Sequence, residues 1–443
     1  MSDMTKVNKV IDYIRNSQWQ DFPTSVKHNA FRSMFDTIGV SAAATKTELS
    51  SIIRNHAARM FGGAGASLWF DGRKVSPVGA ALANAMSIDA LDAHDGQKLT
   101  KGHIGCGLIP GIMAIAEAEG IDDNQEIMTA MVLGYEFGTR AGISLHASTS
   151  DYHTSGAWIA VTVAAIGARL MRLNESQMRH AMGIAEYHGP RSQMMRCIDT
   201  PTMVKDGSGW GAMAGVSAVY LAADGFTGAP AISIEGKDVA DHWADLGSHY
   251  YMDEQYIKLY PVCRWAQPAV EAVLDLMKRH DITADQIANI EISSFDEAVR
   301  LCSMAENTEE AQYSLPFSVA VAAYHGTIGV DEISTAGLTN PDIQAIARKV
   351  SVISNDDFNA EFPKRRLAIA SIETTDGGRF SSDPTEAIGD PEAPVSDDVL
   401  RQKFNTLVSA TCNPETLKNL VHALGDLRQM PDMNKVIAIL RKH

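Results

Sequence analysis

Residues 156–170 read Gly-Ala-Trp-Ile-Ala-Val-Thr-Val-Ala-Ala-Ile-Gly-Ala-Arg-Leu, the longest mostly apolar run of the chain. The run contains Thr162 and Arg169 and is shorter than the roughly 20 apolar residues that a membrane span requires. We therefore interpret it as a helix buried in a protein core. No other stretch approaches the length of a span, so the sequence predicts no membrane association.

The chain on both sides of this run is also predicted to be helical. Ala-rich stretches alternate with short Gly or polar breaks from Pro110 to about Ala223, and apolar residues recur at helical spacing between Val7 and Met60. Small residues fill 212–223, which allows close helix packing. These features predict a compact, all-helical domain.

One short β element is predicted near the N-terminus. Asp71-Gly72 separates two short β-prone runs, which is a strong hairpin signal. Ser76 and Pro77 then form a good N-cap and first helical position. A central helix rich in small residues should follow.

The character of the chain changes near Ile257. Residues 287–293 and 367–374 read as strands, and helices are expected around 319–324 and 343–352. After residue 391 the chain reads as helical again. We therefore predict a mainly α protein with three segments: residues 1–256 as the first part of a large all-helical domain, 257–388 as a smaller α+β lid domain, and 389–443 as helices that return to the first domain.

Charge and cysteine content narrow the class of protein. The 443 residues carry a formal net charge of -16, which argues against nucleic-acid binding and against an anionic membrane surface. An anionic substrate remains compatible, because a pocket can be locally basic. Five dispersed cysteines and an N-terminus without an apolar core predict a reduced, cytoplasmic protein.

The most charged motif is 89–103, which contains three Asp, two His and two Lys beside glycines. Asp and His can ligate a metal, but no tight ligand spacing such as HExxH is present. General acid–base chemistry, with an Asp orienting a His, is the preferred interpretation. Asp92 and His103 are its candidate residues.

Two further motifs precede predicted helices. His153 lies just before the buried helix, where the helix dipole would favour the neutral imidazole, although a capping role fits equally well. Lys205 precedes a Gly-rich turn that could bind an anion through backbone N–H groups. That turn lacks the phosphate-loop pattern, so nucleotide binding is disfavoured.

The fourth motif, Lys258–Trp265, lies at the predicted domain boundary, where ligand sites are common. Arg191, Arg196 and Arg264 could each grip a carboxylate, although a structural role suits any single arginine better. Cys263 is interpreted as a packed thiol rather than a nucleophile.

Taken together, these motifs resemble the MmgE/PrpD family, which includes 2-methylcitrate dehydratase, cis-aconitate decarboxylase and iminodisuccinate epimerase. No single motif is specific, but their order and spacing are, and they span nearly the whole chain. They are Asp92–Asp95 with His103, Gly134–Glu136, Tyr152–Thr154, Ile184-Ala185, Lys205 with Gly209-Trp210, Gly225–Gly228, Lys258–Cys263, Ala311–Pro316, Gly389–Pro391 and Lys403-Phe404.

The resemblance implies a helical domain built from both chain ends, an α+β lid, a homodimer, a cleft between the domains, and neither an organic cofactor nor a metal. It implies catalytic roles for Asp92, His103, His153, Lys205 and Lys258. Substrate binding is assigned to Arg191, Arg264, Gln312 and Tyr313.

The sequence departs from the family pattern at three positions. Gln267 stands near a place where dehydratase-like members have a His, Gly96 stands where a Thr is usual, and Ile104 follows His103 in place of Pro. These departures bear on the substrate, because they fall in the motifs that should line the cleft.

The resemblance implies a cofactor-independent lyase that removes a proton next to a carboxylate of a small di- or tricarboxylic acid. Loss of a hydroxyl would make it a dehydratase, and loss of CO2 a decarboxylase. An epimerase acting on an iminodisuccinate-like dicarboxylate is the runner-up. A metal-dependent hydrolase and a ligand-binding protein without catalysis are the remaining alternatives.

Overall fold

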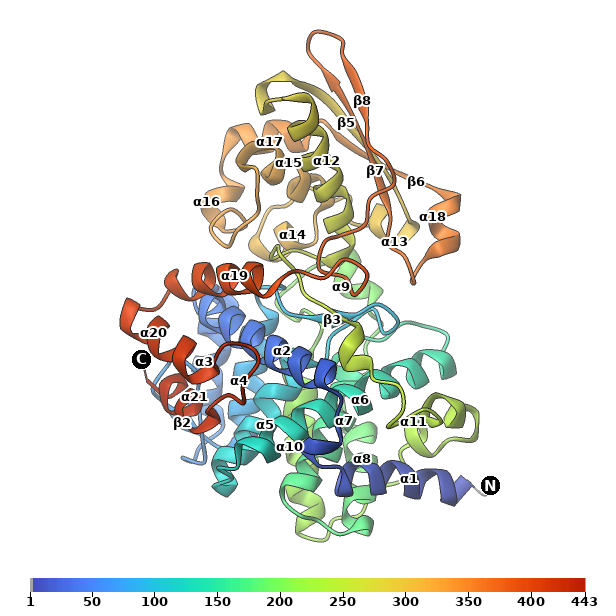
Figure 1. Cartoon of the computed structure of the whole chain (residues 1–443), viewed down its shortest axis with the longest axis vertical. Helices are drawn as coiled ribbons and strands as arrows, with labels where there is room; N and C mark the ends of the chain where they lie inside the picture. The colour runs from blue at the N-terminus through green and yellow to red at the C-terminus, as the bar shows by residue number, and fades with distance from the viewer. Residues whose placement is uncertain (1–2, 443) are drawn as a thin grey trace.

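The computed structural model describes residues 3–442 and consists of two bodies (Figure 1). A large helical body contains both chain ends, and a smaller body with a sheet stands above it. The protein is therefore mainly α, with a larger helical part and a smaller α+β part, as the sequence predicts. Among residues 3–442, no helix combines the length and the apolar character needed to cross a membrane.

The helical body is built around α7 (Gly156–Leu170), the apolar run that the sequence identified. Every residue of α7 is buried, which confirms that interpretation. The other helices that the chain contributes before residue 257 are α1 (Asp3–Asn16), α2 (Thr24–Ala44), α3 (Glu48–Met60), α4 (Pro77–Asp89), α5 (Gly105–Glu119), α6 (Asn124–Ser148), α8 (Glu175–His188), α9 (Met195–Asp199), α10 (Ser208–Ala223) and α11 (Ile232–Glu235).

Close packing of α10 on its neighbours depends on glycine. A Cβ atom at Gly211 would lie 2.4 Å from the carbonyl oxygen of Gly156, and one at Gly215 would lie 2.6 Å from the carbonyl oxygen of Ala160. A side chain at Gly209 would meet the backbone of α4 in the same way. The small residues of these helices therefore bring the loops before α7 and α10 close together.

Two short ladders accompany the helices. β1 (Ala66–Ser67) pairs antiparallel with β2 (Lys74–Val75), which confirms the predicted hairpin, and the Ser76 side chain caps α4. The second ladder, β3 (Gly96–Gln97) with β4 (Gln255–Tyr256), was not predicted, so the helical body is not purely helical. It ties the charged 89–103 loop to the segment that leads into the smaller body.

The smaller body contains a four-stranded sheet of order β6-β5-β7-β8. β5 pairs parallel with β6 and antiparallel with β7, and β7 continues into β8 through a turn at residues 375–378. Its elements are α12 (Gln267–His280), β5 (Ile287–Ser294), α13 (Asp296–Val299), α14 (Thr308–Gln312), α15 (Leu315–His325), α16 (Thr335–Leu338), α17 (Pro341–Ala347), β6 (Val350–Ser354), α18 (Asp356–Glu361), β7 (Ala368–Thr374) and β8 (Arg379–Ser381).

One element prediction was wrong in part. The helix expected over 343–352 ends at Ala347 as α17, and Val350–Ser354 forms the edge strand β6. Val350 and Val352 are partly buried between exposed neighbours, so the segment follows the alternation of a half-covered strand. Parallel pairing with β5, which only the tertiary fold supplies, decides its structure.

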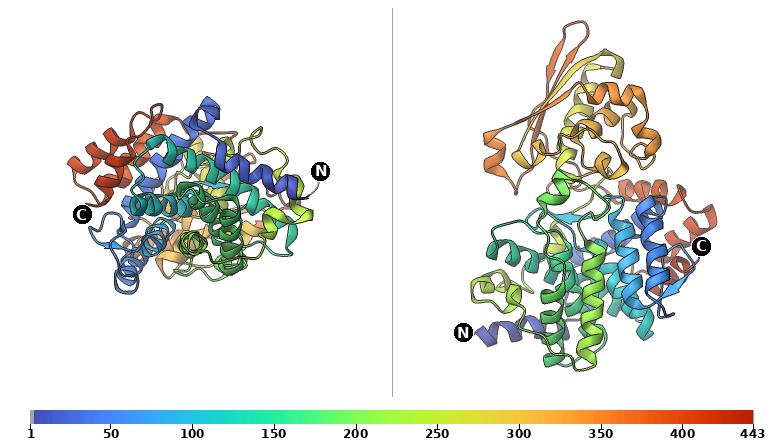
Figure 2. Two further views of the ribbon diagram at one scale, coloured as in Figure 1. Left: turned by 90° about the horizontal axis from the view of Figure 1, so that it is seen from below. Right: turned by 180° about the vertical axis from the view of Figure 1, so that it is seen from behind.

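The chain returns to the helical body beside the point where it left. The Ile257 N–H donates to the carbonyl oxygen of Gly389 over 2.9 Å. Then α19 (Asp397–Ser409), α20 (Pro414–Leu424) and α21 (Met433–Leu440) follow, and α19 packs on α2. Figure 2 shows these last helices beside the first helices of the chain.

Candidate active site

A narrow cavity of about 30 Å³ lies where the two bodies meet. The 89–103 loop, the segment after β4 and the loop before β7 all contribute to it. Its lining residues are Asp92, Lys101, His103, Met194, Ile198, Asp206, Tyr256, Lys258, Cys263, Arg264, Trp265, Tyr313 and Arg366. Larger hollows, such as one between α3 and α20, lack such a concentration of buried titratable groups.

The imidazole of His103 has a fixed orientation in this cavity. Its Nδ1 atom lies 2.6 Å from the backbone carbonyl oxygen of Asp95, and the backbone N–H of His103 donates to Ser155 Oγ over 3.0 Å. Because a carbonyl only accepts, Nδ1 carries the proton and Nε2 is the basic nitrogen. Burial, together with the charges of His94 and Lys258, lowers the pKa of His103 to about 4. His103 is therefore neutral near pH 7 and can accept a proton at Nε2.

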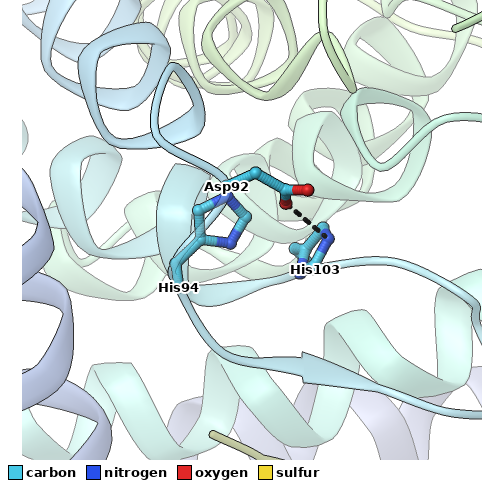
Figure 3. A group of neighbouring side chains, drawn as sticks. All are labelled: Asp92, His94 and His103. Carbon is cyan, nitrogen blue, oxygen red and sulfur yellow. Dashed lines mark ion pairs between the residues drawn. The ribbon is translucent and has the colours of Figure 1, made fainter. Parts of the chain in front are cut away.

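Asp92 forms a buried ion pair with Lys258, whose Nζ lies 2.5 Å from Oδ1 and 3.0 Å from the Asp92 carbonyl oxygen. Burial alone would raise the pKa of Asp92, but Lys258 and Lys205 outweigh burial and lower it to about 2. Asp92 Oδ1 is 4.0 Å from His103 Nε2 (Figure 3). Orientation of His103 therefore comes from the Asp95 backbone, rather than from Asp92 as expected.

A second carboxyl group, that of Asp206, faces the same nitrogen. Its Oδ2 lies 3.6 Å from His103 Nε2 and accepts a hydrogen bond from Ser155 Oγ at 3.0 Å. Burial raises the pKa of Asp206, which favours the protonated acid. Asp206 directly follows Lys205 in the Gly-rich motif. The sequence-based prediction assigned a role in the site to Lys205 alone, because Lys205 carries a positive charge.

Lys205, Gln312 and Tyr313 lie close together, although only Tyr313 of the three lines the cavity. Lys205 Nζ donates to Gln312 Oε1 over 2.7 Å and lies 4.7 Å from the centre of the Tyr313 ring. Gln312 in turn donates to the carbonyl oxygens of Ala90 and Thr308, both at 3.1 Å. This network joins the helical body to α14 of the smaller body. Within the part of the chain that the structure describes, no carboxylate lies at ion-pair distance from Lys205.

Arg264 lies in the cavity wall, but most of its donors are occupied. Its guanidinium binds Asp390, Gln267 and the carbonyl oxygens of Ile388 and Ala387. Gln267 is buried within this network and does not line the cavity. These contacts give Arg264 a structural role, because they join the segment after β4 to residues 387–390, where the chain returns to the helical body. Among the described residues, only its Nε atom has no hydrogen-bond partner.

The structure places His153 and Arg191 outside the lining of this cavity. His153 is partly buried, its backbone N–H donates to His146 Nε2 over 3.0 Å, and its segment bridges to Gln193. Burial and the charge of the exposed Arg191 lower the pKa of His153. The two residues are therefore neighbours of each other, and nothing in this arrangement brings them to His103.

Cys263 lines the cavity as a packed thiol. Burial and the neighbouring Asp92 raise its pKa to about 12, so the thiolate that nucleophilic chemistry needs is disfavoured. All five cysteines are unpaired.

Backbone strain gathers around the cavity. Asp92, Lys101 and Lys205 adopt φ values of 50°, 55° and 47°, which L-residues with side chains rarely adopt. Each such residue costs on the order of 1–2 kcal/mol. Because three residues of the same site share this conformation, the surrounding packing evidently holds their side chains in place.

Gly96, one of the departures from the family pattern, has a steric reason. A Cβ atom there would lie 2.4 Å from the Tyr256 hydroxyl oxygen and 2.7 Å from His103 Nδ1. Absence of a side chain therefore lets the phenol of Tyr256 pack beside His103, with ring centres 6.4 Å apart.

The site also contains a group that could hold a metal ion. Ligand atoms of Asp92, His94 and His103 all lie within 4.8 Å of one another (Figure 3). Burial lowers the pKa of His94 to about 3, so its imidazole is neutral as a metal ligand requires, and its Nε2 lies 3.5 Å from Asp89 Oδ1. Against this, the ammonium of Lys258 already sits on the Asp92 carboxylate, and its charge opposes a second cation.

Buried acids, a neutral imidazole and several cations give this cavity groups that are suited to proton transfer. Comparison with known families identifies the class of protein: the MmgE/PrpD N-terminal domain matches residues 8–245, and the MmgE/PrpD C-terminal domain matches residues 260–425. The chain belongs to the MmgE/PrpD family, as its motifs indicated.

Three relatives are lyases by name. The chain is 22% identical to a cis-aconitate decarboxylase of Aspergillus terreus, with 83% of this chain and 82% of that protein covered. It is 22% identical to the cis-aconitate decarboxylase of Mus musculus, with 93% and 88% covered. A mitochondrial 2-methylcitrate dehydratase of Yarrowia lipolytica is 26% identical over 28% of this chain and 26% of its own length.

Proposed function

We propose that this protein is a lyase that acts on a small di- or tricarboxylic acid at the carbon next to a carboxylate, by dehydration or decarboxylation, without an organic cofactor. The observation that carries the proposal is the geometry of His103, whose Nδ1–H is fixed by the Asp95 carbonyl so that the basic Nε2 faces the cavity. The names of the relatives support the reaction class.

A dehydration would proceed from this geometry in two proton transfers. His103 Nε2 removes the proton next to the carboxylate, and the developing negative charge is stabilised by the nearby Lys258. The β-hydroxyl then leaves as water after it receives a proton, and the two carbons form a double bond. Asp206, whose pKa is raised by burial, is a suitable proton donor.

A decarboxylation uses the same groups with the proton moving the other way. The bond to the departing CO2 breaks, its electron pair stays on the carbon, and an acid of the site returns a proton there. An epimerase would return a proton to the opposite face of the carbon. These reactions share the cations and the acid–base pair but differ in product.

Proton NMR in D2O with purified protein tests the proposal. The substrates to test are 2-methylcitrate, citrate, cis-aconitate and iminodisuccinate, each with a chelator-treated sample. Formation of an unsaturated acid or of CO2 supports a lyase, whereas deuterium incorporation with inversion alone supports the epimerase. A variant His103→Gln serves as the matched negative control. Neither turnover nor exchange with any of the four acids would contradict the proposal.

We also propose that the protein forms a homodimer, as the family resemblance implies. Tyr187, Trp210, Phe226 and Ile232 expose large apolar side chains around α8, α10 and α11, with exposed fractions between 46% and 78%. Apolar side chains of this size favour burial in an interface. Light scattering coupled to size-exclusion chromatography should give twice the mass of the chain, and a monomer would contradict the idea.

A further inference from the structure

Arg366 stands out among the buried charges because two of its nitrogens have no partner. It lies between α18 and β7, and only 1% of its surface is exposed. Nη2 donates to the Lys98 carbonyl oxygen over 3.1 Å, but Nε and Nη1 have no hydrogen-bond partner in the described part of the chain. A buried guanidinium with idle donors is costly, so such a group in a native protein usually has a ligand.

Arg264 lies in the same cavity wall but differs from Arg366 in its partners. Both guanidinium groups line the cavity and lie near the ring of Tyr256, at 4.7 Å for Arg264 and 5.5 Å for Arg366. Arg264 has a carboxylate partner in Asp390, whereas no carboxylate lies within ion-pair distance of Arg366 among residues 3–442. Asp390 is also bound by Lys98 at 3.1 Å, so its charge is already shared.

A second cation, Lys101, lies close to Arg366. Burial, followed by the charge of Arg366, lowers the pKa of Lys101 to about 8, and Glu297 opposes the shift. Its ammonium lies 3.9 Å from the centre of the Tyr152 ring and donates to the Leu99 carbonyl oxygen, and it has no ion-pair partner among the described residues. Two neighbouring cations that both line the cavity form a receptor for an anion.

We infer that Arg366 and Lys101 bind a substrate carboxylate other than the one beside the reacting carbon. Tyr256 lies between this pair and His103, since its ring contacts both Arg366 and the His103 imidazole. Lys258, which neighbours His103 through Asp92, remains available to the reacting end. The inference rests on the proposed function for its reaction, and it requires a substrate with at least two carboxylates.

Titration calorimetry with propane-1,2,3-tricarboxylate, an unreactive tricarboxylate, tests this subsite without turnover. Loss of a charge-assisted, bidentate contact in Arg366→Met should raise Kd roughly tenfold to a hundredfold. Arg366→Lys keeps the charge and should recover part of the affinity, and Lys101→Met should weaken binding as well. Arg365→Met is the matched control, because the adjacent Arg365 is exposed and pairs with Glu386 outside the cavity.

A Kd unchanged in Arg366→Met, an equal loss in Arg365→Met, or no binding to the wild-type protein would overturn the inference. Circular dichroism melting shows whether each variant is folded. If Arg366→Met does not fold, the comparison of Arg366→Lys with the wild-type protein still tests the inference. Tricarboxylate binding that depends on Arg366, without exchange in D2O, would count against the proposed lyase but not against this subsite.

Discussion

The Nδ1 atom of His103 lies 2.6 Å from the backbone carbonyl oxygen of Asp95, and the Asp95 side chain points away to the hydroxyl of Tyr135. One residue thus supplies the acceptor that selects the His103 tautomer and a carboxyl group embedded in the helical core. Substitution of Asp95 changes its side chain but leaves its backbone carbonyl in place. The base His103 and the buried carboxyl group of Asp95 can therefore be tested separately.

Replacement of His103 should abolish most activity, and replacement of His153 should not. We expect His103→Gln to reduce kcat by about 10²–10⁴, the usual contribution of a general base. His153→Ala should retain most activity, because His153 does not line the cavity. Steady-state kinetics with the substrate found by NMR decide this, with the exposed His325→Ala as control. The reverse ranking of the two variants would assign the base to His153.

On the acid side of neutrality, kcat/KM should stay high until the pH is well below about 6. A base acts when it is deprotonated, so activity should fall only as the pH drops through the His103 pKa of about 4. A cation binds a carboxylate when it is protonated, so activity should also fall as the pH rises through the Lys101 pKa of about 8. Lys101→Arg should remove that alkaline limb. An acid limb near 6.5 would contradict the buried, neutral His103.

Asp95 should make the protein less stable as the pH rises. Burial raises its folded pKa to about 7, well above that of an unfolded carboxyl. The folded state then holds a proton that the unfolded state releases, so stability is complete below about pH 4 and declines up to about pH 7, by as much as roughly 4 kcal/mol. Urea unfolding at pH 5 and pH 8 measures this loss of stability, and we expect the loss to be smaller in Asp95→Asn than in the wild-type protein. An equal loss in the two proteins would contradict the prediction.

A side chain at Gly96 should disturb the site through Tyr256. Gly96→Ala places a Cβ atom 2.4 Å from the Tyr256 hydroxyl oxygen and should lower the free energy of unfolding by about 1–3 kcal/mol. Tyr256→Phe removes that oxygen, so the double variant should recover part of the loss. A double-mutant cycle measured by urea unfolding gives the coupling, and strictly additive effects would refute the contact as the cause.

Treatment with a chelator should leave activity intact. Asp92, His94 and His103 form the group best placed for a metal, but the Lys258 ammonium at 2.5 Å already neutralises Asp92. The measurement is turnover before and after dialysis against EDTA, with elemental analysis of the protein. Loss of activity that zinc or magnesium restores would move the protein to the metal-dependent alternative.

Much of the fold follows from local pattern. The buried α7, the Asp71-Gly72 hairpin and the Ser76 cap are set by residues that are adjacent in the chain. The strand β6 was missed because Val350–Ser354 is short, lies at a sheet edge and is stabilised by a parallel partner about 60 residues away. The three-segment domain division remains a prediction.

The candidate site was predictable where a motif carries several charged residues. Asp92, His103 and Lys258 belong to such motifs and meet in the cavity. Arg366 lies in no motif, and its place in the cavity wall depends on tertiary contacts with Tyr256 and with Lys98, which is 268 positions earlier in the chain. The role of His153 remains a prediction: the structure places it outside the lining of this cavity, and a place before a helix does not reveal which way the side chain faces.

The chain leaves the helical body near Ile257 and returns to it near Gly389, beside the same point. This arrangement has a consequence for synthesis on the ribosome. The smaller body is an insertion whose two ends meet through a single backbone hydrogen bond, so its sheet can be completed while the rest of the chain is still being made. The buried face of α2, made near the beginning, finds its partner α19 only after residue 409 has been translated. The contact of α2 with α19 is therefore among the last contacts of the helical body to form, after every residue that lines the cavity has been made.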